Sequence, residues 1–72
     1  MEQTPYFVNS VLKRRPYLTM AMCESVIAAP YREEPQPDGR IRYWGKVGDK
    51  WLRVVVEGDA LHNAFFDRGF KP

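Results

Sequence analysis

One histidine and a set of arginines are the side chains of this 72-residue chain best suited to chemistry on a phosphate group. An imidazole exchanges a proton near neutral pH, and a guanidinium binds phosphate oxygens through a planar fork of N–H donors. His62, together with Arg53 or with Asp67 and Arg68, would therefore suit the attack of a ribose 2′-hydroxyl on its own phosphate. The alternative is that His62 is a partly exposed strand residue without a chemical role.

A second set of candidate residues combines arginine with tryptophan. Arg42 and Trp44 precede a turn signal at 48–50, and Trp51 and Arg53 follow it. Because side chains alternate between the two faces of a strand, these four residues share one face of a hairpin. On such a face, rings can stack on nucleic-acid bases while guanidinium groups pair with phosphates. The alternatives are Arg–Trp packing within the protein and a protein–protein interface.

Other patterns of catalytic or metal-binding residues are missing. Cys23 is the only cysteine, which excludes an intramolecular disulfide and a cysteine-based zinc site. The sequence also lacks a second histidine, a glycine-rich phosphate loop and a serine triad pattern. We therefore expect no metal and no cofactor, and we expect Cys23 to be a small core residue.

The first part of the chain predicts two short helices that would position these residues. Thr4 begins a helix with an apolar stripe at 7, 8, 11 and 12. Arg14 and Arg15 stand at its end, where they either bind a phosphate or only complement the helix dipole. Thr19 caps a second helix that ends near residue 29. The apolar stripe of this second helix comprises Met20, Cys23, Val26 and Ile27.

The rest of the chain predicts four short strands, because Asp-Gly and Gly-Asp turn signals separate alternating segments. The first strand contains Pro35 and should lie at an edge of the sheet. We predict an α+β fold of order ααββββ, in which two N-terminal helices pack on one face of a four-stranded antiparallel meander. Both faces of the last strand are partly apolar, so alternation does not decide which one is buried. The predicted strands cover about 31–36, 40–47, 51–57 and 61–66 within a single domain, 1–72.

Composition limits the classes of binding partner and the cellular compartment that we expect. The net charge of +2 is too small for a dedicated DNA-binding domain. Seven of the eleven cations are arginine, which favours anion contacts or, alternatively, packing on an aromatic-rich surface. No apolar run approaches the ~18 residues of a membrane span, and the N-terminus has no signal-peptide pattern. We therefore expect a cytoplasmic protein without a membrane segment.

Beyond these patterns, the chain resembles a group of small bacterial domains over about residues 9 to 68. The similar features are the basic helix end, the second helix opened by Leu18-Thr19, Pro30, the hairpin segment 38–43 (Asp-Gly-Arg-Ile-Arg-Tyr) and the strand 52–56 (Leu-Arg-Val-Val-Val). The segments 38–42 and 63–68 (Asn-Ala-Phe-Phe-Asp-Arg) also resemble stretches of uncharacterised bacterial proteins. The group is that of BrnT, within the RelE/ParE toxin-like superfamily. This resemblance implies a small α+β fold with an RNA-binding basic sheet face, metal-independent cleavage of mRNA, and an antitoxin partner.

The resemblance also implies which positions would contact RNA. Arg14 or Arg15 would match the basic residues of the first helix, and Arg42 and Arg53 would match those of the strands. His62, or Asp67 with Arg68, would stand where the last strand and the tail contribute. The histidine common in the first helix of the group is missing here, where Asn9 and Lys13 are the nearest polar residues.

Three functions stay open at this point. The first is a metal-independent endoribonuclease of toxin type, in which Arg42 and Arg53 bind phosphate and His62 transfers the proton. The second is a non-catalytic module that binds RNA or a protein through Trp44, Trp51 and the neighbouring arginines. The third is a structural or regulatory protein that forms a dimer through an exposed strand edge.

Overall fold

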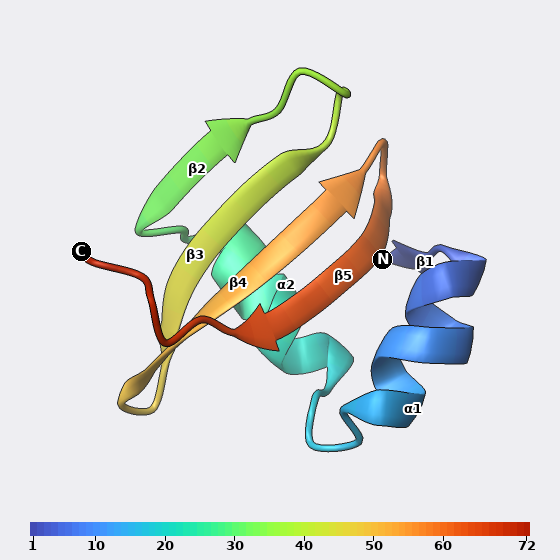
Figure 1. Cartoon of the computed structure of the whole chain (residues 1–72), viewed down its shortest axis with the longest axis horizontal. Helices are drawn as coiled ribbons and strands as arrows, with labels where there is room; N and C mark the ends of the chain where they lie inside the picture. The colour runs from blue at the N-terminus through green and yellow to red at the C-terminus, as the bar shows by residue number, and fades with distance from the viewer.

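Four strands form the antiparallel meander that the turn signals predict, as the computed structural model of residues 1–72 shows (Figure 1). Gly48 and Gly58 stand in the two tight turns of this meander, with φ angles of 66° and 60°. Glycine is favoured there because it adopts a positive φ without steric cost. The four strands are β2 (Arg32–Pro35), β3 (Ile41–Val47), β4 (Lys50–Glu57) and β5 (Ala60–Phe66).

The sheet has a fifth strand that the sequence pattern does not predict. Strand β1 (Glu2–Gln3) pairs in parallel with Ala60 and Leu61 of β5, and the order of the sheet is β1-β5-β4-β3-β2. The α+β class is confirmed, but a mixed five-stranded sheet replaces the expected four-stranded antiparallel one. A strand of two residues is too short to show alternation, so periodicity could not reveal it.

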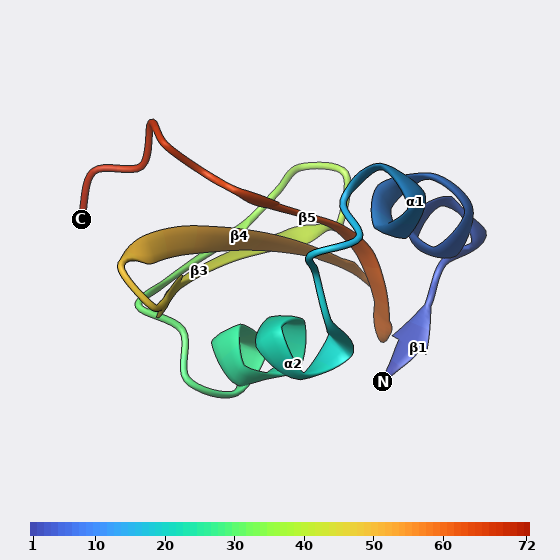
Figure 2. The same ribbon diagram turned by 90° about the horizontal axis from the view of Figure 1, so that it is seen from below.

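The first helical segment lies beside the sheet edge, whereas both helices were expected on one face. It consists of a π-helical stretch, η1 (Phe7–Val11), followed by α1 (Leu12–Arg14). Figure 2 shows this segment next to β5, while α2 (Met20–Ala28) covers one face of the sheet. In this segment Phe7 and Val11 are fully buried, whereas Val8 of the expected stripe is 43% exposed.

Two threonines cap the helical segments, as the sequence predicts. Thr4 Oγ1 accepts a hydrogen bond of 3.1 Å from the Phe7 amide, and Thr19 Oγ1 accepts one of 3.1 Å from the Met22 amide. Each bond satisfies an N–H group that the first helical turn leaves without an acceptor. The first of these caps also holds Thr4 beside β5, since the Thr4 amide donates to the Leu61 carbonyl over 2.9 Å.

The hydrophobic core lies between α2, η1 and the covered face of the sheet. Leu52, Val54 and Val56 of β4 point into it, as alternation predicts, and Cys23 is fully buried among them. Helix α2 approaches β3 closely at Gly45, where an added Cβ atom would lie 3.2 Å from both methyl groups of Val26. The opposite face of the sheet carries no helix, and we call it the open face (Figure 2).

A bulge in β5 decides the orientation that alternation left open. Val55 pairs with Asn63 and Val56 with Leu61, so His62 has no residue opposite it. The extra residue shifts the alternation by one position. Leu61 is consequently fully buried in the core, while His62 and Asn63 both lie on the open face.

Candidate functional site

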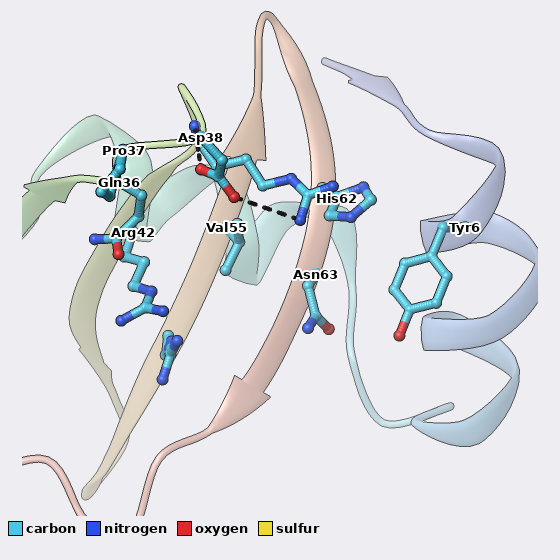
Figure 3. A pocket seen from close by; sticks show the side chains of 10 residues that line it. Tyr6, Gln36, Pro37, Asp38, Arg42, Val55, His62 and Asn63 are labelled. Atoms are coloured by element: carbon cyan, nitrogen blue, oxygen red, sulfur yellow. Dashed lines mark hydrogen bonds and ion pairs between the residues drawn. The ribbon is translucent and has the colours of Figure 1, made fainter.

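An open pocket of about 510 Å³ lies on the open face, between the three central strands, the loop before β3 and the start of the first helical segment (Figure 3). We call it the basic pocket, because three arginines and the only histidine contribute to its wall. Figure 3 shows Tyr6 facing His62 and Asn63 of β5. The lining residues are Tyr6, Gln36, Pro37, Asp38, Arg40, Arg42, Arg53, Val55, His62 and Asn63.

Arg42 and Arg53 reach this pocket from neighbouring strands. Arg42 pairs with Val55 and Arg53 with Trp44, so both guanidinium groups belong to the open face, as alternation predicts. Arg42 has no carboxylate within ion-pair distance, whereas Arg53 Nη1 lies 4.0 Å from Asp67 Oδ2. Burial and, next, the charge of Arg42 lower the pKa of the Arg53 guanidinium. The two arginines therefore form a crowded pair of like charges, which the carboxylates of Asp67 and Glu34 compensate in part, and a bound anion would stabilise this pair further.

Arg15, at the end of α1, approaches the same part of the open face as Arg53. Arg15 and Arg53 both contact the ring of Phe65, with Cζ atoms 5.8 Å and 5.1 Å from its centre. Arg15 Nη1 and Arg53 Nε are also the two buried side-chain nitrogens that have no hydrogen-bond partner in the protein. A buried donor without an acceptor costs about 1–3 kcal/mol.

His62 is oriented by groups on two neighbouring segments. Its Nδ1 atom lies 3.1 Å from Thr4 Oγ1 and 3.5 Å from Glu57 Oε2, and its ring centre is 5.1 Å from that of Tyr6. These contacts engage Nδ1 and leave Nε2 as the ring nitrogen without an internal partner. The bulge at His62 and the π-helical stretch after Tyr6 lie side by side at one end of the pocket, and such irregular elements are frequent at functional sites.

Tyr6 and Asn63 are pocket residues that the sequence reasoning missed. Tyr6 is 41% exposed, and its hydroxyl accepts a hydrogen bond of 3.0 Å from Arg14 Nη2. Asn63 Oδ1 accepts a hydrogen bond from the Ala64 amide, so the amide nitrogen of Asn63 keeps its donors for a ligand. A tyrosine directly before a helix and an asparagine after a histidine are common surface patterns, and neither one signals a pocket.

Arg40 contributes less charge to the pocket than its position implies. Its guanidinium lies 3.8 Å from Asp38 Oδ2 and 3.5 Å from Glu57 Oε1, so two carboxylates compensate it. Both ion pairs are exposed, and such pairs are worth at most about 1 kcal/mol each. Arg42 and Arg53 therefore remain the principal anion-binding groups of the basic pocket.

The two tryptophans have different surroundings. Trp44 is 5% exposed, stacks on Phe70 at a ring distance of 5.2 Å, and donates an indole hydrogen bond of 3.0 Å to Asp67 Oδ2. Trp51 is half-buried, and its ring centre lies 4.9 Å from that of Tyr31 and 5.0 Å from that of Phe70. The C-terminal tail thus folds onto the open face and covers the ring of Trp44, which leaves this ring unable to stack on a base.

A second pocket, of about 680 Å³, lies at the end of the sheet near the β3–β4 turn. We call it the end pocket. Asp67 and Arg68 contribute to it, which gives the predicted tail residues a place beside a cavity. Its lining residues are Tyr17, Asp49, Lys50, Trp51, Phe66, Asp67 and Arg68.

No three histidine, cysteine or acidic side chains come together as a metal site would require. None of the helices has the length and apolar character needed to cross a bilayer.

No protein-family model matches the chain, and neither a curated protein nor a solved structure resembles it significantly. The basic pocket is therefore the feature from which a function can be argued.

Proposed function

We propose that the protein binds single-stranded RNA through the open face of its sheet, with a backbone phosphate in the basic pocket. The observation that carries this proposal is the crowded pair of Arg42 and Arg53, of which Arg42 has no carboxylate partner. Arginine binds phosphate with two parallel hydrogen bonds, and a desolvated guanidinium gains more from such a bond than an exposed one. The same assignment would follow from the resemblance to the BrnT group, which implies an RNA-binding basic sheet face.

The other pocket residues have roles that suit a ribonucleotide. The Asn63 amide can donate to a phosphate or ribose oxygen, and the Tyr6 ring offers a partly exposed aromatic surface to a base. Arg15 extends the positive surface along Phe65, so that a neighbouring phosphate has a second place to bind. Tyr6 takes over the stacking role that the sequence reasoning gave to Trp44, because the ring of Trp44 is covered by Phe70.

Binding of a labelled single-stranded RNA, followed by fluorescence anisotropy at two salt concentrations, tests this proposal. We expect Arg42→Gln to weaken binding roughly tenfold and to reduce the salt slope by about one, as for the loss of one phosphate contact. Lys13→Gln is the matched control, because Lys13 is exposed on α1 and lines neither pocket. Equal losses in both variants would point to unspecific attraction and contradict the proposal, as would the absence of binding at low salt.

Metal-independent cleavage of the bound RNA is a second candidate function, and the surroundings of His62 favour it. With Nδ1 held by Thr4 and Glu57, the Nε2 atom can take the proton of a ribose 2′-hydroxyl. The 2′-oxygen then bonds to phosphorus and the bond from phosphorus to the 5′-oxygen breaks. The leaving oxygen takes up a proton from water, and His62 returns its proton to the solvent. Arg42 and Arg53 would stabilise the charge on the phosphate during this step, which yields a 2′,3′-cyclic phosphate and a 5′-hydroxyl.

Incubation of RNA with the protein in EDTA separates cleavage from binding. If the protein is a nuclease, the wild-type chain produces cyclic-phosphate ends, His62→Gln does not, and both proteins bind RNA with similar affinity. An RNA with a single 2′-deoxy position should resist cleavage at that position only. If RNA stays intact with the wild-type chain while binding is saturable, cleavage is rejected and the protein is a binding module.

A further inference from the structure

The end pocket has no part in the function proposed so far, although it is the larger of the two cavities. We propose that it binds a base of the same RNA strand whose phosphate occupies the basic pocket. This inference rests on the proposed RNA binding and adds a second subsite to it. Three features carry it: two stacked aromatic rings, two cations that form no ion pair, and an ion pair that joins a residue of one pocket to a residue of the other.

The stacked aromatic rings are those of Tyr17 and Phe66. Their rings stack with centres 5.7 Å apart and an interplanar angle of 19°, and Tyr17 is 52% exposed. One face of the Tyr17 ring is used by Phe66, and the exposure of the side chain leaves surface for another flat ring. Stacking of a nucleic-acid base on an aromatic side chain contributes about 1–3 kcal/mol and tolerates any base.

The charge of the end pocket fits an anionic ligand. Lys50 Nζ lies 5.5 Å from the centre of the Phe66 ring, and neither Lys50 nor Arg68 forms an ion pair within the protein. Of the two acidic groups in the pocket, Asp67 is engaged, since its carboxylate accepts hydrogen bonds from the Trp44 indole and the Gly69 amide. The pocket therefore contains two cations that form no ion pair, Lys50 and Arg68, and one carboxylate without such a partner, that of Asp49. A flat ring with adjoining phosphates matches this combination, whereas an uncharged apolar segment does not.

The two pockets meet at the ion pair of Arg53 and Asp67, whose Nη1 and Oδ2 atoms are 4.0 Å apart. Arg53 lines the basic pocket and Asp67 lines the end pocket. Lys50 is three positions from Arg53 along β4, so its side chain leaves the opposite face of the sheet, next to Phe66. An oligonucleotide with a phosphate at Arg53 would therefore reach Tyr17 by passing around the end of the sheet, where Trp51 and Asp67 line the end pocket.

The length of the RNA provides the test. We expect a hexanucleotide to bind the wild-type protein at least tenfold more tightly than a dinucleotide, because only the longer strand fills both pockets. Tyr17→Ala should remove this gain and leave the affinity for the dinucleotide unchanged. Tyr17→Phe is the matched control, since it keeps the ring and removes a hydroxyl that forms no hydrogen bond, and it should retain the gain. Lys50→Gln provides a second variant on a different element, and it should reduce the gain at low salt.

The outcomes distinguish this inference from the proposed function. If Tyr17→Ala binds the hexanucleotide as the wild type does, while Arg42→Gln weakens both lengths, the end pocket is not a subsite and the proposed function stands. If Tyr17→Ala weakens both lengths equally, Tyr17 acts on the fold or on the basic pocket, and the inference is rejected. If hexaglutamate displaces the hexanucleotide from the wild-type protein, and Tyr17→Ala and Lys50→Gln each abolish this displacement, the end pocket binds an acidic protein segment. The RNA subsite is then likewise rejected. If the wild-type protein binds neither RNA, both proposals fail.

Discussion

At the scale of single residues, the closest contact between helix and sheet is the one at Gly45. A methyl group there would lie 3.2 Å from Cγ1 and Cγ2 of Val26, which is fully enclosed by the core. We expect Gly45→Ala to lower the free energy of unfolding by about 1–3 kcal/mol, as overpacking of a core does. Gly69→Ala is the control, because its Cβ would meet only Asp67 Oδ1 at 3.6 Å, and it should be nearly neutral. Urea unfolding of both variants measures this, and an unchanged midpoint for Gly45→Ala would contradict the tight packing.

Cys23 makes stability depend on pH in the alkaline range. Burial and, to a smaller extent, the charge of Glu24 raise the pKa of the Cys23 thiol to about 11 from its ordinary value of 9.0. The unfolded chain therefore loses the thiol proton first, and stability that is present below pH 9 is lost as the pH rises towards 11. Between pH 8 and pH 10.5 the wild-type protein should lose about 2 kcal/mol more than Cys23→Ala does.

Urea unfolding of the wild type and of Cys23→Ala at the two pH values provides the measurement. Burial also raises the pKa of Tyr43, but this tyrosine is present in both proteins and its effect cancels in the comparison. Parallel losses in the two proteins would mean that the Cys23 thiol ionises as easily in the folded chain as in the unfolded one.

The sequence predicts on which face of the sheet a side chain lies at the regular positions of the hairpin. It does not do so for side chains beside irregular backbone. Alternation places Arg42 and Arg53 together on the open face, because β3 and β4 pair without a shift over their whole length. It could not place His62, which follows a change of register. It could not show that Trp44 is covered either, since Phe70 reaches it through a tail outside the strands.

At the scale of elements, the two threonine caps offer a matched pair of variants. Thr4→Ala and Thr19→Ala each remove one capping hydrogen bond, which should cost about 1 kcal/mol in either case. Only Thr4 also contacts His62, so the imidazole NMR signals of His62 should shift in Thr4→Ala and stay in place in Thr19→Ala. Thermal unfolding and a histidine-detected spectrum give both readouts. An unmoved His62 signal in Thr4→Ala would show that the threonine does not orient the ring.

Turn chemistry explains why the meander was predictable and the first helical segment less so. The bounds of all four predicted strands agree with the structure to within one residue at each end, because glycine-containing turns separate them. The helix start at Thr4 was predicted correctly from its cap. The π-helical stretch was not, because no recognised pattern in the residues of η1 indicates its wider turn.

At the scale of the whole molecule, the sheet is protected at both edges. The edge strand β2 is exposed throughout and has the sequence Arg-Glu-Glu-Pro, in which the charges and Pro35 oppose pairing with another chain. The other edge is occupied by β1 and by the first helical segment (Figure 1). The radius of gyration of 11.2 Å agrees with the ~11 Å expected for a compact chain of this length.

We therefore expect a monomer, and light scattering at millimolar concentration would show it. In contrast, the dimer considered from the sequence would need β2 to pair with its copy. A dimer that dissociates when Glu34 is changed to proline would support that alternative and contradict the expectation of a monomer.

The position of β5 has a consequence for synthesis on the ribosome. This strand is made last among the elements, yet it supplies Leu61 and Ala64 to the core and is the partner of both β1 and η1. At about 5–20 residues per second, the first helical segment waits roughly 3–10 s for that partner to be translated. Until residue 66 has passed the exit tunnel, Phe7 and Val11 remain in water, so the native fold forms only after this point. During these seconds the two side chains are exposed apolar groups of the kind that chaperones bind.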